Sequence, residues 1–322
     1  MKHHNPHTTP LTRRELSLLT GTSAAALASF LKPEETIPLT AATTGVSAAG
    51  VKRALAEQGV AYPCRVIAHI TMRGGIGKTT ASISAAVRAS QYGFKVCVLD
   101  LDPQGSSSHA FNAAPGEGDP IFYDVWQNPA ELLSDALKPI RENLSLLPSS
   151  LENALLDASL INPGSQKKAV KGVCAALVAD GYDTIIIDCP PSLGIAVIST
   201  ICAADMVVIP VGSDAFSLKG LEATLNEITS IRDTFGLPMP ELRILFSRYD
   251  RREKVSQDAL ETLRSRFEHL PLTVIGTSSE FSKALAAGGT VFSSFRKSQA
   301  RDDYDQYVRD ILGIGLAGTD KQ

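Results

Sequence analysis

The sequence lacks two features that would assign it to large classes of proteins. No stretch approaches the roughly 18 consecutive apolar residues that a membrane-spanning helix needs, so the sequence predicts no transmembrane segment. The formal net charge is only −3, which excludes a general electrostatic attraction to nucleic acid. Any contact with DNA must therefore come from a local basic patch.

Paired cysteine motifs are also missing. None of the five cysteines has the C-x-x-C spacing typical of zinc or redox sites, and several lie in apolar runs. This pattern predicts buried thiols in a reducing compartment, and therefore a cytoplasmic protein. The cysteines are Cys64, Cys97, Cys174, Cys189 and Cys202.

What is present is the composition of a globular protein with a sizeable core. Hydrophobic residues make up 44% of the chain and charged residues 20%. A length of 322 residues allows one large α/β domain and a small additional module.

A glycine-rich run, MRGGIGKTT at residues 72–80, is the most informative motif. It lies between an apolar run at 65–70, typical of a buried strand, and a helix-like segment at 81–91. Glycines let backbone N–H groups surround an anion, and the helix N-terminus adds its positive dipole end. The run predicts a nucleotide-phosphate loop formed by Gly74, Gly75, Ile76, Gly77, Lys78, Thr79 and Thr80. Lys78 would contact the phosphates, and the Thr79 hydroxyl would ligate Mg²⁺.

Carboxylates follow two other predicted strands. Asp100 and Asp102 come after the apolar run 96–99, and Asp188 comes after the run 184–187. In a parallel sheet, ligands bind outside the carboxyl ends of the strands. We therefore expect these three side chains to face the same crevice as Lys78.

Alternating strands and helices predict a doubly wound, mostly parallel α/β sheet with helices on both faces. A loop is expected at 112–120, where glycine, proline and aspartate concentrate. Helical patterns include 218–233 and 253–267. Further strands are expected at 144–147, 206–211, 243–247 and 272–275.

The motifs together resemble the ParA/MinD class of P-loop ATPases, and within it the ParA partition proteins. RGGIGKTT resembles the family's deviant Walker A motif, LDLDPQGSSS its A′ motif, and TIIIDCPPSLG its Walker B motif with the switch region. Four shorter matches follow in order, and the resemblance covers about residues 66–312. The shorter matches are residues 208–211, 217–221, 249–252 and 282–284.

The resemblance implies a partition ATPase that uses ATP and Mg²⁺. It implies that Lys78, Asp102 and Arg73 act in catalysis, and that Thr79, Asp188 and Asp100 form the metal site. It also implies a homodimer formed on ATP binding, non-specific DNA binding, a ParB-type centromere-binding partner and a nucleoid-associated location. Two alternatives remain open: positioning or transfer of a mobile element, and an ATP-sensing transcriptional autorepressor.

Two positions depart from the family pattern. Arg73 stands where relatives carry a signature lysine that reaches the nucleotide of the partner subunit; arginine keeps the charge but changes the geometry. Glu280 stands where relatives often carry a DNA-contacting arginine. The other arginine used for DNA aligns with Arg252, so Arg252 and its neighbour Arg251 are the candidate contacts.

The segment before the resemblance carries an internal repeat, TGTSAA at 20–25 and TGVSAA at 44–49. A glycine turn between short helices is typical of a helix-turn-helix. The second copy would present Lys52 and Arg53 to DNA, and the alternative is a helical bundle used for dimerisation. The predicted organisation is a disordered stretch at 1–10, a small all-α module at 11–62, the ATPase domain at 65–313 and a polar tail at 314–322.

Two membrane-related alternatives are less favoured. The stretch TRRELS at 12–17 with the apolar residues after it is similar to a twin-arginine export signal, but no clean cleavage site follows. A MinD-like membrane anchor needs a basic amphipathic helix at the C-terminus, and residues 301–312 carry more acid than base.

Overall fold

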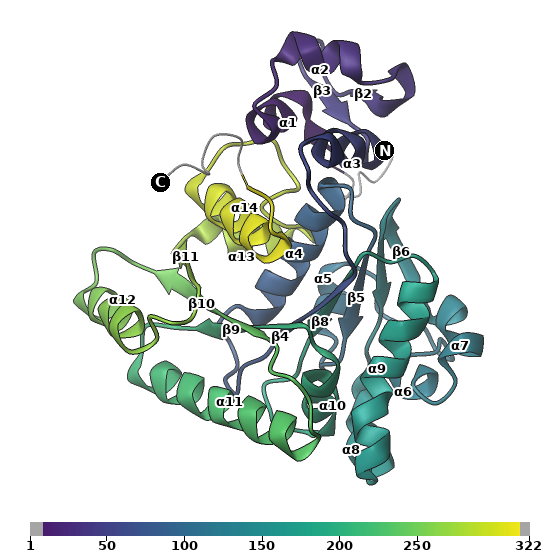
Figure 1. The fold of residues 1–322 in the computed structure, drawn as a ribbon, viewed down its shortest axis with the longest axis vertical. Coiled ribbons are helices and arrows are strands. Elements are labelled where there is room, and N and C mark those ends of the chain that lie inside the picture. Colours follow the sequence, from purple (N-terminus) through teal and green to yellow (C-terminus); the bar gives the residue numbers. More distant parts are fainter. Residues whose placement is uncertain (1–8, 316–322) are drawn as a thin grey trace.

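The computed structural model describes residues 9–315, whose centre is an eight-stranded sheet (Figure 1). The strand order is β11-β10-β9-β4-β8-β5-β7-β6, and every neighbouring pair is parallel except β6 and β7. The strands are β4 (Arg65–His69), β5 (Val96–Asp100), β6 (Lys138–Arg141), β7 (Leu144–Leu147), β8 (Thr184–Asp188), β9 (Met206–Val211), β10 (Glu241–Tyr249) and β11 (Leu272–Gly276).

The central strands are apolar on both faces because helices cover both sides of the sheet. Alternate side chains of β4 enter separate cores, Val66 and Ala68 in one and Ile67 in the other. The first core is shared with α6 (Phe122–Val125), α7 (Pro129–Ala136), α8 (Leu156–Ser159), α9 (Pro163–Ala179), α10 (Ile195–Ala203), α11 (Ala215–Thr234) and α12 (Lys254–Arg266). The second is shared with α4 (Lys78–Gln91), α5 (Ser106–Ala110), α13 (Ser279–Ala286), α14 (Gln299–Leu312) and the N-terminal segment.

This architecture confirms the predicted doubly wound, mostly parallel fold. The seven strands expected from the sequence are all present, and residues 112–120 form a loop. The edge strand β6 was not predicted, because its sequence Lys-Pro-Ile-Arg is short, polar and interrupted by proline. A short 3-10 helix, η3 (Leu151–Leu155), precedes α8.

The N-terminal module is not all-α, so that expectation is wrong. It combines helices with a three-stranded antiparallel sheet in the order β1-β3-β2. Its elements are β1 (Leu11–Thr12), α1 (Arg13–Thr20), α2 (Ala24–Phe30), the 3-10 helix η2 (Pro33–Glu35), β2 (Thr36–Pro38), β3 (Thr44–Val46) and α3 (Ala48–Glu57).

The two repeats fold differently. In the first, Gly21 adopts a left-handed φ of 64° and separates α1 from α2. In the second, Thr44–Val46 forms the central strand β3, so no helix-turn-helix forms at residues 44–49. Pro10 packs so closely there that a Cβ on Gly45 would lie 2.6 Å from its Cγ. What the repeats share is a serine, Ser23 or Ser47, whose side chain caps the next helix.

The ends of the described chain are packed. Thr9 and Pro10 are buried, and the Thr9 carbonyl accepts a 2.8 Å hydrogen bond from Gln91 Nε2. The predicted disorder is therefore wrong for these two residues, and its remainder, 1–8, lies outside the described residues. Ile314 is likewise buried, whereas 316–322 of the predicted tail lie outside the described residues.

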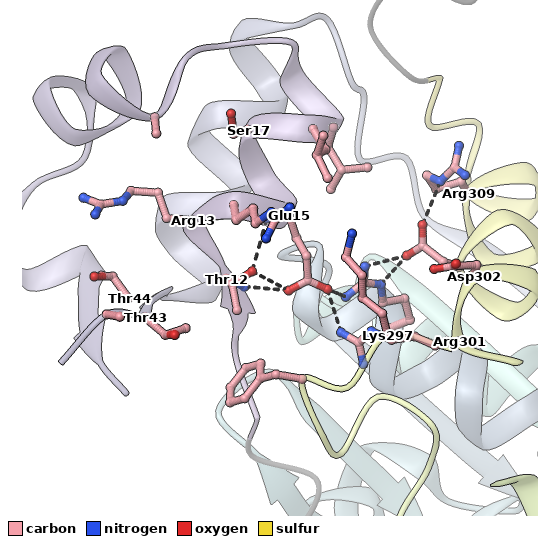
Figure 2. A pocket seen from close by; sticks show the side chains of 18 residues that line it. Thr12, Arg13, Glu15, Ser17, Thr43, Thr44, Lys297, Arg301, Asp302 and Arg309 are labelled. Carbon is pink, nitrogen blue, oxygen red and sulfur yellow. Dashed lines mark hydrogen bonds and ion pairs between the residues drawn. The ribbon is translucent and has the colours of Figure 1, made fainter. Parts of the chain in front are cut away.

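Glu15 joins the N-terminal module to the ATPase domain (Figure 2). Its Oε2 accepts hydrogen bonds from Thr12 N at 2.9 Å and Thr12 Oγ1 at 2.7 Å, which caps α1. Its Oε1 lies 2.6 Å from Arg301 Nη2 on α14 and 3.4 Å from Arg88 Nη1 on α4. Burial alone would raise the pKa of Glu15, but the two guanidinium charges outweigh burial and hold this pKa below its ordinary value.

We expect Glu15→Ala to lower the free energy of unfolding by about 3 kcal/mol, because it leaves Arg88 and Arg301 short of a buried counter-charge. Chemical denaturation at neutral pH measures this change, and Glu34→Ala, on an exposed side chain, is the control. The lowered pKa means that the contribution of Glu15 is present at neutral pH and is lost as the pH falls below about 4. Equal stability of the Glu15→Ala and Glu34→Ala proteins would contradict this role.

No helix within residues 9–315 is long and apolar enough to cross a lipid bilayer.

Candidate nucleotide-binding site

The glycine-rich loop connects β4 to α4 at the carboxyl edge of the sheet. Gly75 and Gly77 adopt left-handed φ values of 76° and 90°, which side chains other than glycine rarely accept. A Cβ on Gly75 would meet no atom within 4 Å, so the backbone at this position is open to a ligand. Gly77 then precedes the first turn of α4, whose N–H groups face the loop. This local geometry is that of a phosphate-binding turn.

Lys78 is a buried cation that lines the adjoining cavity. Lys78 is 7% exposed, yet no described residue forms a hydrogen bond or an ion pair with its ammonium group. A buried charge is stable only with a partner, so this position suits a phosphate. The cavity has a volume of about 730 Å³, which is the size of a nucleotide site. Gly74, Gly75, Gly77, Thr79, Thr80 and Asp102 also line it.

Asp100 and Asp188 lie side by side at the ends of β5 and β8, where their Cα atoms are register partners. Burial and the neighbouring carboxylate raise the pKa of Asp100, and burial raises that of Asp188. A bound divalent cation would remove this unfavourable proximity of two carboxylates. The Thr79 side chain lies close enough to Asp188 to lower its pKa. The three predicted metal ligands are thus together, and they fit a Mg²⁺ site completed by substrate phosphates.

Asp102 lines the same cavity as the loop. It is 6% exposed, and its Oδ1 accepts a 3.0 Å hydrogen bond from Gln104 N. Ser149 Oγ donates to the Asp102 carbonyl at 2.7 Å, which fixes the backbone on this side. The carboxylate is therefore held at the cavity by its own turn.

Sequence reasoning missed the hydroxyls that hold the two metal-site carboxylates. Ser107 Oγ donates to Asp188 Oδ2 at 2.8 Å, and Ser108 Oγ donates to Asp100 Oδ2 at 2.7 Å. The run of three serines that ends the A′ motif was the available signal. Arg248 was missed as well: it lines the cavity from the end of β10, with a left-handed φ of 60°.

Arg73 does not line the cavity of its own loop. Its Nη1 forms an ion pair with Asp214 and donates to Ser217 Oγ at 3.1 Å, near the start of α11. The Arg73 and Asp214 side chains are 41% and 42% exposed, so solvent screens this contact.

The candidate DNA residues of the ATPase domain lie at the surface. The Arg252 side chain is 81% exposed and forms an ion pair with Asp250 at 2.6 Å, and Arg251 is exposed. Glu280 lies in the first turn of α13, where an acidic side chain suits the helix dipole.

Lys52 and Arg53 do not form the predicted recognition surface. Lys52 Nζ lies 2.8 Å from Asp183 Oδ2 of the ATPase domain, and Arg53 is paired with Glu35 inside the module. Helix α3 also rests on the turn after α4, where a Cβ on Gly93 would lie 2.7 Å from the Ala48 carbonyl oxygen. The pattern that suggested a DNA-reading helix therefore corresponds to a helix docked on its own chain.

Comparisons with known proteins agree with this geometry. A family model described as an AAA domain (AAA_31) matches residues 64–243. An uncharacterized protein of Mycobacterium tuberculosis, Rv1708, is 30% identical over 78% of this chain and 79% of its own length. The sporulation initiation inhibitor protein Soj of Bacillus subtilis is 27% identical over 78% of this chain and 99% of its own.

A solved structure supports the ligand assignment. Cobyrinic acid a,c-diamide synthase from Mycobacterium smegmatis, with bound ADP and magnesium, is 28% identical, has a TM-score of 0.63, and is matched over 77% of this chain and 94% of its own. The same enzyme has also been solved with an ATP analogue and magnesium, and the loop, the carboxylates and the cavity of this chain fit ATP and Mg²⁺. The chain therefore belongs to the AAA_31 family and is a P-loop ATPase of the ParA/MinD type.

Proposed function

We propose that this chain is a DNA partition ATPase that cycles between a monomer and an ATP-bound dimer. The observation that carries the proposal is the placement of Lys78 and Asp102 at one cavity, with the buried Asp100–Asp188 pair behind it. The Lys78 ammonium group forms no hydrogen bond or ion pair with a described residue, but its charge acts on Asp188. The similarity to the chromosome partitioning protein ParA of Caulobacter vibrioides, 26% identical over 78% of this chain, supports the choice of partition among the activities of the family.

Each residue of the site has a role that follows from its position. Lys78 neutralises phosphate charge, and the N–H groups of the Gly74–Gly77 loop hold the phosphate oxygens. Thr79, Asp188 and Asp100 would hold Mg²⁺, and the bound ion would shield negative charge on the phosphates. Asp102, which lines the cavity, would orient the attacking water and accept its proton. Ser107 and Ser108 keep the two metal-site carboxylates in place.

Dimerisation would move Arg73 from Asp214 to the phosphates of the partner subunit. The pair with Asp214 is exposed and therefore weak, so the exchange costs little. A guanidinium paired with a phosphate in a water-excluded interface is a stronger, bidentate contact. The structure of the monomer is thus compatible with an arginine that changes partners when ATP binds.

The dimer would bind DNA through Arg252 and Arg251. Two subunits together present two copies of this basic surface, and one copy alone is too small to bind DNA. A ParB-type partner would then stimulate hydrolysis and release, and DNA binding would place the protein on the nucleoid. The operator-binding role considered for Lys52 and Arg53 is not included, since both residues are occupied in ion pairs.

Charge reversal at Arg252 tests the DNA step. We expect Arg252→Glu to weaken ATP-dependent DNA binding and to reduce the slope of log affinity against log salt by about two per dimer, one for each lost phosphate contact. Fluorescence anisotropy with a DNA duplex across a salt titration measures both quantities. Arg264→Glu, on an exposed side chain in the last turn of α12, is the matched control.

An unchanged salt slope in the Arg252→Glu protein would remove this residue from the DNA surface. Glu280→Arg is the converse variant, and we expect it to strengthen binding and steepen the salt dependence. DNA binding that is equal with and without ATP would contradict the dimer requirement.

A further inference from the structure

A second large cavity is separate from the nucleotide site. It has a volume of about 890 Å³ and lies between the N-terminal module and the C-terminal part of the ATPase domain (Figure 2). Its walls come from α1, from the turn before β3, from the end of α4 and from residues 295–309. A space of this size accommodates a nucleotide-sized molecule.

The lining of this cavity is basic, although the chain as a whole is acidic. Six cationic side chains line it against three carboxylates. This excess of three positive charges contrasts with the formal net charge of −3 for the chain. The cations are Arg13, Arg14, Arg88, Lys297, Arg301 and Arg309, and the carboxylates are Glu15, Asp302 and Asp305.

Three of the six cations are buried and form the inner layer of the cavity, and two of the three carboxylates form ion pairs with them. The Arg88, Arg301 and Arg309 side chains are 4%, 7% and 9% exposed, and they are paired with only Glu15 and Asp305. Three buried guanidiniums against two carboxylates leave the inner layer with a net positive charge. Such a charge is costly to bury without an anion nearby.

The rim adds three more cations that have no ion pair among the described residues: Arg13, Arg14 and Lys297. Arg13 and Arg14 occupy the first turn of α1, where the helix dipole disfavours a cation. Lys297 approaches the cavity from the other domain, as Figure 2 shows. Two parts of the chain that are distant in sequence thus bring like charges to one space, which raises the free energy unless an anion binds between them.

We propose that this cavity binds a small phosphate-bearing molecule, held by Arg13, Arg14 and Lys297 above the buried arginine layer. Phosphate is an anion that guanidinium and ammonium groups lining one cavity suit well. The exposed side chains of Leu18 and Phe295 also line the cavity and leave room for an organic part of the ligand. Duplex DNA is the competing ligand class, and a cavity enclosed between two domains favours the small molecule.

The test uses the full-length protein with its P-loop already filled by a non-hydrolysable ATP analogue and Mg²⁺. Titration with pyrophosphate in a calorimeter should then show one further saturable site per chain. Lys297→Glu and Arg13→Glu should each weaken this binding at least tenfold, whereas Lys297→Arg should retain it. Lys171→Glu, on α9 at the opposite face of the sheet, is the matched control and should change nothing.

The ATP analogue binds at the P-loop, outside this cavity. Wild-type affinity for the analogue therefore confirms that a variant is folded. Lys297→Ala serves as a milder replacement if a charge reversal fails this check. The proposal is overturned if the filled wild-type protein binds no pyrophosphate, or if charge reversal leaves the binding unchanged. It is overturned equally if the same variants lose binding of a DNA duplex while binding of pyrophosphate is unaffected.

Discussion

Lys78→Ala is expected to lose measurable ATP binding. The ammonium group is the only buried cation of the described residues that lines the nucleotide cavity without an ion pair or hydrogen bond, so its removal leaves the phosphates with backbone donors alone. A charge-assisted contact of this kind contributes about 3 kcal/mol, and its loss corresponds to a weakening of affinity by about 100-fold or more. Calorimetric titration with ATP and Mg²⁺ measures the change.

Lys171→Ala, on an exposed helix face away from the cavity, is the control for removing a lysine. The Lys78 variant should remain folded, because no described residue forms a hydrogen bond or an ion pair with its ammonium group, and circular dichroism checks this. Wild-type affinity for ATP in the Lys78→Ala protein would show that the nucleotide binds elsewhere.

Asp102→Ala is expected to separate nucleotide binding from hydrolysis. Its carboxylate faces the cavity but belongs to neither the loop nor the Asp100–Asp188 pair, so ATP should still bind. Loss of a positioned general base lowers turnover by roughly two to four orders of magnitude. Steady-state phosphate release, measured beside ATP affinity, gives both quantities. We expect the variant to accumulate as the ATP-bound dimer.

Asp124→Ala is a matched control, because Asp124 is an aspartate that caps a short helix outside the site. Normal turnover in the Asp102→Ala protein would exclude Asp102 from the reaction. Loss of ATP affinity together with turnover would instead place Asp102 among the binding groups.

The ATPase fold was predictable because the central strands are continuous apolar runs, two of which, β5 and β8, end in a candidate site residue. Asp100 and Asp188 follow their strands directly, and parallel pairing brings such ends to one edge. The positions of Lys78 and Thr79 were also predictable, because both residues belong to the glycine-rich motif between β4 and α4. What could not be predicted was which hydroxyls hold the carboxylates, since that depends on the path of the chain after Asp102.

The N-terminal module shows where local sequence is insufficient. TGTSAA and TGVSAA encode the same serine cap, but only tertiary contacts decide whether the residues before the serine are helix or strand. Val46 is buried between β1 and β2, and Gly45 accommodates Pro10, so the second copy is drawn into a sheet. Lys52 and Arg53 were assigned to DNA because sequence alone does not show their partners Asp183 and Glu35.

ATP-driven dimerisation is the central step of the proposed function, and light scattering with a non-hydrolysable ATP analogue measures it most directly. The account predicts that the wild-type protein shifts from monomer to dimer with the analogue and Mg²⁺ but stays monomeric with ADP. Arg73→Ala should bind the analogue yet fail to dimerise, and Arg73→Lys should recover much of the dimer. A wild-type protein that remains monomeric with the analogue, or an Arg73→Ala protein that dimerises as fully as wild type, would contradict the account.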